Sequence, residues 1–212
     1  MTKSETLDSR VRDLQAWIEH PPHTECSVFV CPVLDELLHT LYKRADESGR
    51  QRIKDILPCL IDVRSSFDVT VRRSLVLADF AVRRFLPVVL REANLPDVEA
   101  RLDSLDAIQG EASADAARYA VWPITDAIQR LVAAEYEAVG SARPALLRAC
   151  VAAEYAAESV ESAARAVRSA ACHVGAIGGA PEDAARSAAK AALMAGLSAV
   201  PWLDCVKALL KI

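Results

Sequence analysis

Apolar residues recur along most of the chain at intervals of three and four positions, which is the spacing of one face of an α-helix. The first such stripe consists of Leu7, Val11, Leu14 and Ile18. No segment alternates apolar and β-branched residues with polar ones at period two, the pattern of a half-buried strand. The pattern therefore predicts an all-α protein, an antiparallel array of about eight or nine helices with no sheet.

Prolines, glycines and capping residues divide this pattern into elements. We expect helices over residues 4–19, 32–44, 50–63, 68–94, 96–108, 114–139 and 145–174, another from residue 181, and a short last helix after Pro201. Pro58 predicts a kink or a break, Pro87 a bend and Pro123 an interruption of the helices that contain them. Ser113 is expected to cap the helix that follows it.

The composition changes along the chain. Of the 212 residues, 52% are hydrophobic but only 5% are aromatic. Leu, Ile, Val and Phe supply the apolar positions up to residue 108, and Ala supplies most of them from residue 112 onward. Because no long flexible linker separates these parts, we expect residues 1–212 to form a single helical domain with a bulky-core half, 1–108, and an Ala-rich half, 112–212.

Pairs of small residues repeat every seven positions in the Ala-rich half. They are Ala149–Cys150, Ala156–Ala157, Ala163–Ala164 and Ala170–Ala171. A heptad repeat keeps one face of a helix toward a partner helix, and small residues allow the two axes to approach closely. We call these pairs the small-residue seam. The Ala pairs of residues 184–192 are the natural partner, either within the chain or across a homodimer.

Charge and hydropathy narrow the choice of partners and location. The formal net charge is −4, so the chain lacks the overall basic character with which proteins bind nucleic acid phosphates. The polar start, "MTKSETLDSR", has no apolar stretch typical of a signal peptide, and no run of about 18 apolar residues could span a membrane. We therefore expect no nucleic acid, no membrane and a cytoplasmic location, in which the six cysteines are reduced thiols.

Two groups of residues raise the possibility of a metal site. His20, His23, Cys26 and Cys31 lie in one short segment and are the donor types that zinc accepts. Structural zinc sites usually draw their donors from two separated pairs, so a loop with surface histidines and core-facing thiols is the favoured interpretation.

Glu36 and His39 form an E-x-x-H motif, which di-iron bundles use twice. The chain has no second copy, so the motif is better interpreted as the polar edge of a helix.

Two arginine pairs mark the most apolar helix. Arg72–Arg73 and Arg83–Arg84 are eleven residues apart, which returns them to nearly the same helix face about 16 Å along the axis. They could clamp an acidic ligand or partner, although a solvated charged face is the favoured alternative, with Asp79 paired to Arg83.

The chain has no glycine-rich phosphate loop, no G-x-S-x-G and no C-x-x-C. No catalytic residue is identified, and an enzyme is not expected.

The stretches "RRSLVLADFAVRRFLPVVL" (72–90) and "ARLDSLDAIQGEASADAARYAV" (100–121), with the Ala-rich helices that continue to about residue 195, carry a resemblance. They are similar to a group of Ala-rich, all-helical bacterial proteins, some of which are labelled immunity proteins. The resemblance implies a protein that binds and blocks a protein partner without catalysing a reaction. It assigns no catalytic residue.

The leading hypothesis from the sequence is a non-catalytic helical protein that binds a partner protein, in the manner of an immunity protein or antitoxin, without a cofactor. The alternative is a helical bundle that binds a metal or a small molecule, an enzyme included, through the His/Cys segment and Glu36/His39. A third hypothesis is a structural protein that associates with itself through the small-residue seam.

Overall fold

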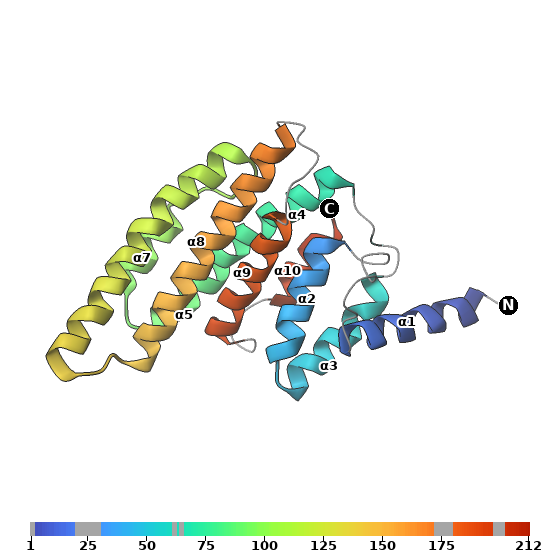
Figure 1. Ribbon diagram of the computed structural model, residues 1–212, viewed down its shortest axis with the longest axis horizontal. Coiled ribbons are helices and arrows are strands. Elements are labelled where there is room, and N and C mark those ends of the chain that lie inside the picture. Colours follow the sequence, from blue (N-terminus) through green and yellow to red (C-terminus); the bar gives the residue numbers. More distant parts are fainter. Residues whose placement is uncertain (1–2, 20–30, 61–62, 64–65, 172–179, 197–201) are drawn as a thin grey trace.

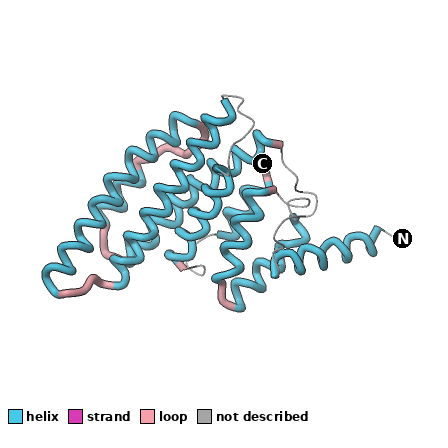
Figure 2. The backbone as a smooth tube through the Cα atoms, viewed as in Figure 1, coloured by secondary structure: helices cyan, strands magenta, loops and turns pink. Residues whose placement is uncertain are grey.

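The computed structural model describes residues 3–19, 31–60, 63, 66–171, 180–196 and 202–212 (Figure 1). Every regular element in these ranges is helical and none is a strand, which confirms the all-α prediction (Figure 2). The α-helices are α1 (Lys3–Glu19), α2 (Pro32–Arg44), α3 (Glu47–Ile56), α4 (Phe67–Phe80), α5 (Leu86–Glu92), α6 (Pro96–Asp103), α7 (Glu111–Val139), α8 (Pro144–Ala171), α9 (Ala180–Ala195) and α10 (Trp202–Leu210). Since α4 and α5 are joined by a π-helical segment, the described part contains nine helical rods.

The break predicted at Pro58 is observed, but the start of the same helix was predicted too late. Helix α3 ends at Ile56 and continues as a 3-10 turn over Leu57–Leu60, which contains the proline. Its start lies at Glu47, because the side chain of Asp46 accepts a 2.7 Å hydrogen bond from the amide of Gly49 and caps the helix. Residues 47–50 therefore form the first helical turn rather than a loop.

The apolar rod around Pro87 is continuous. Before the proline, Ala81–Phe85 form a π-helical turn that the amide of Leu86 closes by bonding to the carbonyl of Ala81. A proline cannot donate to the carbonyl four residues earlier and its ring crowds that carbonyl, so a widened turn accommodates it without breaking the helix. The rod made of α4, this turn and α5 packs against α8 and α9, and so lies at the centre of the molecule.

Helix α7 departs from the prediction at two positions. It runs from Glu111 to Val139 without the interruption expected at Pro123. Both Pro123 and Tyr119 are exposed, so the carbonyl that loses its helical partner lies on the solvent side. The cap is Gly110 rather than Ser113: the Oγ of Ser113, inside the first turn, accepts hydrogen bonds from the amides of Gln109 (2.9 Å) and Gly110 (3.1 Å).

The small-residue seam is occupied within the chain. Helices α8 and α9 pack along each other, and Ser159 Oγ of α8 donates a 2.9 Å hydrogen bond to the carbonyl of Ala184 on α9. The alanines on both sides are fully buried: Ala149, Ala156, Ala157, Ala163 and Ala164 on α8, and Ala184, Ala185, Ala188, Ala189 and Ala191 on α9. Of the two predicted arrangements, the described residues show the one within the chain, with α9 packed along the seam.

One apolar core joins the two halves of the chain. It extends from Leu14 on α1 through the α4–α5 rod to Leu209 on α10. Helix α7 lies at one edge of the molecule and α1 at the other (Figure 1). Helix α7 packs against α8 and α6, and the side turned away from them is exposed. None of the described helices is both long and apolar enough to cross a membrane.

Candidate functional site

Three of the predicted metal donors, His20, His23 and Cys26, lie outside the described residues. The fourth, Cys31, precedes α2 and is buried, with its Sγ 3.9 Å from the Oγ1 of Thr70 on α4. Within the described part of the chain, no group of three His, Cys, Asp or Glu side chains is placed to hold a metal ion.

Both ring nitrogens of His39 are engaged. Nδ1 lies 2.5 Å from Oδ1 of Asp35 on the same helix, and Nε2 lies 3.0 Å from the carbonyl oxygen of Trp17 on α1. Both partners are acceptors, so the geometry favours the doubly protonated imidazolium. Burial lowers the pKa of His39, but the bonds to Asp35 and Trp17 outweigh it and raise the pKa above its ordinary value. His39 has no nitrogen free for a metal, and instead ties α1 to α2.

Glu36 turns toward a different partner. Its Oε1 accepts hydrogen bonds from the Nε of Arg186 on α9, at 2.7 Å, and from Thr40 Oγ1, at 3.2 Å. Arg186 also contacts Asp183 Oδ1 at 3.0 Å. Glu36 therefore links α2 to α9 while His39 links α2 to α1. The structure thus places both side chains of the E-x-x-H motif in contacts between helices.

The charge on His39 predicts a pH-dependent stability. Since its pKa is raised above 6.5 by folding, the stabilisation is complete below about pH 6.5 and is lost as the pH rises through the folded pKa. We expect His39→Gln to cost on the order of 1 kcal/mol of unfolding free energy at pH 5.5 and less at pH 8.5. Urea unfolding of both proteins across this range measures the difference, and a difference independent of pH would show that His39 does not titrate as inferred.

The four arginines do not form one clamp. Arg73 is 3% exposed, and its Nε donates a 3.0 Å hydrogen bond to the carbonyl of Leu209 on α10. Arg83 pairs with Asp79 at 3.3 Å, as expected. Arg72 and Arg84 are exposed. Neighbouring positions on a helix point about 100° apart, so one member of the first pair faces the core while the other faces solvent.

Two of the cysteines are poor nucleophiles. Burial, followed by the nearby carboxylate of Glu154, raises the pKa of Cys150 to about 11. Burial also raises the pKa of Cys205, which is 1% exposed. Because the thiolate is the reactive form, these thiols are inert at neutral pH.

A cavity of about 330 Å³ lies where the ends of α2, α3, α9 and α10 meet. Its lining comprises Arg44, Ala45, Asp46, Ser48, Gly49, Arg52, Leu193, Gly196 and Trp202. The guanidinium groups suit an anion, but the carboxylate of Asp46 lies in the same wall and already caps α3. Neither histidine nor cysteine is among these residues, so the lining offers no imidazole and no thiol.

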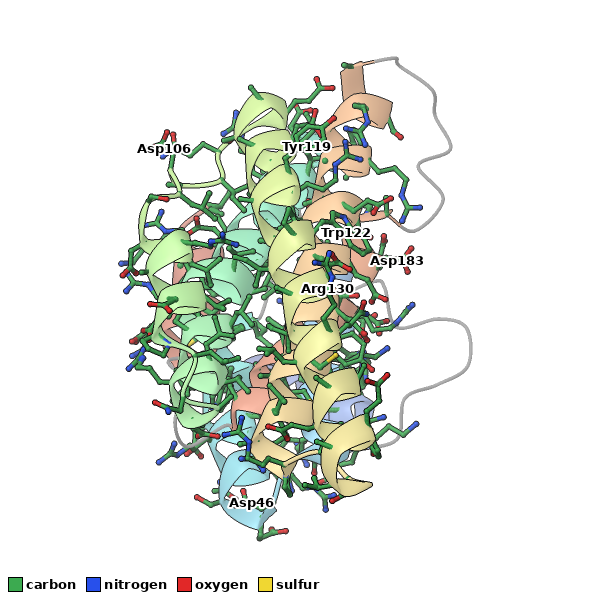
Figure 3. The ribbon with its side chains drawn as sticks, turned by 90° about the vertical axis from the view of Figure 1, so that its left-hand side faces the viewer. Asp46, Asp106, Tyr119, Trp122, Arg130 and Asp183 are labelled. Carbon is green, nitrogen blue, oxygen red and sulfur yellow. The ribbon has the colours of Figure 1, made fainter. Side chains whose placement is uncertain are left out.

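The outer face of α7 presents side chains that the core does not use. This face consists of Tyr119, Trp122, Pro123, Asp126, Arg130, Ala133, Ala134 and Glu137, all exposed. Tyr119 is 70% exposed and Trp122 45%, and with Arg130 they follow one another along the helix (Figure 3). The guanidinium of Arg118 lies 4.9 Å from the centre of the Tyr119 ring, and Asp126 pairs with Arg130. Tyr136, 49% exposed, flanks the face.

Sequence reasoning missed this surface because it interpreted the Ala-rich helices by their packing faces. The signal was available: Tyr119 and Trp122 lie opposite the buried stripe of Ala117, Val121 and Ile124.

The Glu–Tyr repeat at residues 135–136 and 154–155 is structural. Glu135 binds the backbone amide (2.8 Å) and Nε (2.7 Å) of Arg143, and these bonds, the first of them most, lower the pKa of Glu135.

Comparison with known proteins adds no assignment: no protein-family model, no curated protein and no solved structure matches the chain.

Proposed function

We propose that this chain is a non-catalytic helical protein that binds a partner protein through the outer face of α7. The observation that carries the proposal is the exposure of Tyr119 and Trp122 on a helix whose opposite side is anchored in the core. Tyr, Trp and Arg dominate the binding energy of protein interfaces, and this face offers one of each within three turns. A 29-residue helix supported by α8 presents them without a large ordering cost.

Among the described residues, those that could act as acids, bases or nucleophiles support this choice, because the ones described above serve the fold. His39 and Glu36 connect helices, Glu135 holds the turn before α8, and the thiols of Cys150 and Cys205 are protonated. The resemblance of residues 72–195 to Ala-rich bacterial proteins, some labelled immunity proteins, points in the same direction. It implies that binding blocks the partner.

Replacing Trp122 with alanine is expected to weaken partner capture at least about tenfold, since a central interface tryptophan contributes roughly 2 kcal/mol or more. The tagged chain and the variant are incubated with lysate of the native host, and bound protein is quantified by mass spectrometry. Phe67→Ala is the matched control, because Phe67 is 41% exposed on α4. No stoichiometric partner, or equal loss with both variants, would contradict the proposal.

A further inference from the structure

The outer face of α7 has a symmetry in its sequence. Asp126 lies two residues before Ile128 and Arg130 lies two residues after it. Tyr119 lies nine residues before Ile128 and Glu137 lies nine after it. Each acidic or hydrogen-bonding group on one side of this midpoint thus has a complementary group at the same distance on the other side.

The bulky and small side chains follow the same rule. Trp122 and Pro123 lie six and five residues before Ile128, and Ala133 and Ala134 lie five and six residues after it. In an antiparallel pair of helices related by a two-fold axis, residues equally far from the midpoint lie opposite each other. The large side chains of one helix would then face the alanines of the other, twice.

We propose, on the basis of the function proposed above, that the outer face of α7 binds a second copy of this chain, with the two α7 helices antiparallel about Ile128. Asp126 of each copy pairs with Arg130 of the other, so the existing pair within each helix extends to a cluster of four charges. Trp122 of each copy packs over Ala134 of the other. Such small residues allow the axes to approach within about 8–10 Å.

The opposite direction of packing is less favourable. In a parallel pair the residues at equal positions meet, so Trp122 would face Trp122, Asp126 would face Asp126 and Arg130 would face Arg130. Like charges directly opposite each other are repulsive. The charge order along α7 therefore selects the antiparallel arrangement.

The extent of the contact sets its strength. From Tyr119 to Glu137 the face spans about 27 Å, or five helical turns. A single helix pair of this length buries less than the standard interface of about 1,600 Å², so we expect dissociation in the micromolar range. Since the same face serves the proposed partner, self-association and partner binding exclude each other, and the dimer is the form without partner.

Sedimentation equilibrium of the purified full chain across the micromolar range tests the proposal. The wild type is expected to reach twice the 22.9 kDa mass of the chain. Ala134→Glu fills the space opposite Trp122 and places a carboxylate there, and should raise the dissociation constant at least about 30-fold, about 2 kcal/mol. Ala100→Glu, at an exposed position of α6, is the matched control and should leave it unchanged.

A charge exchange tests the direction of packing. Asp126→Arg places two cations opposite each other and should weaken the dimer, while Asp126→Arg combined with Arg130→Asp should restore it. All of these positions are exposed, so we expect each variant to fold. Circular dichroism melting verifies this. A wild type that remains monomeric, an Ala134→Glu variant that dimerises normally, or a double exchange without recovery would overturn self-association.

The failure of this proposal can be distinguished from the failure of the proposed function. A monomeric wild type that still captures another protein through Trp122 would overturn the second copy as the partner and leave partner binding intact. If the dimer forms as expected but no other protein is captured, the face serves self-association alone.

Discussion

Replacing Ala156 with leucine is expected to lower the free energy of unfolding by about 3 kcal/mol. Ala156 is fully buried on α8, one turn before Ser159, whose hydroxyl bonds to the backbone of α9. Positions three apart on a helix lie on nearly the same face, so Ala156 lies on the side of α8 that bonds to α9. A leucine there adds three heavy atoms to a packed contact, and either the rotamer or the separation of the helices must change.

Urea unfolding followed by circular dichroism measures this effect as a lower midpoint with an unchanged slope. The matched control is Ala116→Leu, an exposed position within α7 that should change stability by less than about 0.5 kcal/mol. Equal midpoints for Ala156→Leu and the wild type would mean that α8 and α9 separate without cost, which contradicts close packing at the seam.

Truncating Arg73 to alanine is the second change with a large expected effect, about 3 kcal/mol of unfolding free energy. The side chain is almost completely buried, and its Nε holds the carbonyl of Leu209 at the end of α10. Removal leaves a cavity between α4 and α10, and it also leaves a buried carbonyl without its donor. The positive charge lies at the end of α10 where the helix dipole is negative, so a favourable electrostatic contact is lost as well.

Arg73→Met separates packing from charge. Methionine fills much of the same volume, but it cannot donate to Leu209. Within the described part of the chain, Nη1 of Arg73 is buried without a hydrogen-bond partner, so removing the guanidinium also relieves a desolvation cost. We expect Arg73→Met to cost less than half as much as Arg73→Ala in the same urea unfolding measurement. Equal costs would show that the bond to Leu209, rather than packing, holds α10.

Local features of the sequence were sufficient for the helices and for most of their ends. Pro32 opens α2 and Pro144 opens α8, as a residue suited to the first helical turn should. The heptad of small residues also identified its partner helix, because periodicity and side-chain size are local properties. The effect of Pro123 could not be predicted in this way: a helix tolerates a proline where solvent or a widened turn accommodates the freed carbonyl, and that depends on the fold.

The candidate sites required the tertiary structure because their partners are distant in sequence. Arg73 contacts a residue 136 positions away, and Glu36 contacts one 150 positions away. A polar residue on a helix is compatible with solvent, a metal or a neighbouring helix, and only the packing of α9 and α10 decided among these. The same is true of α7, whose aromatic residues face outward because α8 covers the other side.

The sequence by itself therefore determined the all-α class, the helices and the close packing of α8 with α9, since these follow from periodicity, caps and side-chain size within a few turns. The tertiary structure alone decided that α9 occupies the seam within the chain, that His39 and Arg73 hold helices together, and that the outer face of α7 remains exposed. The physical reason is that burial and pairing depend on which distant segments pack together. The spacing of residues along one helix does not specify those segments.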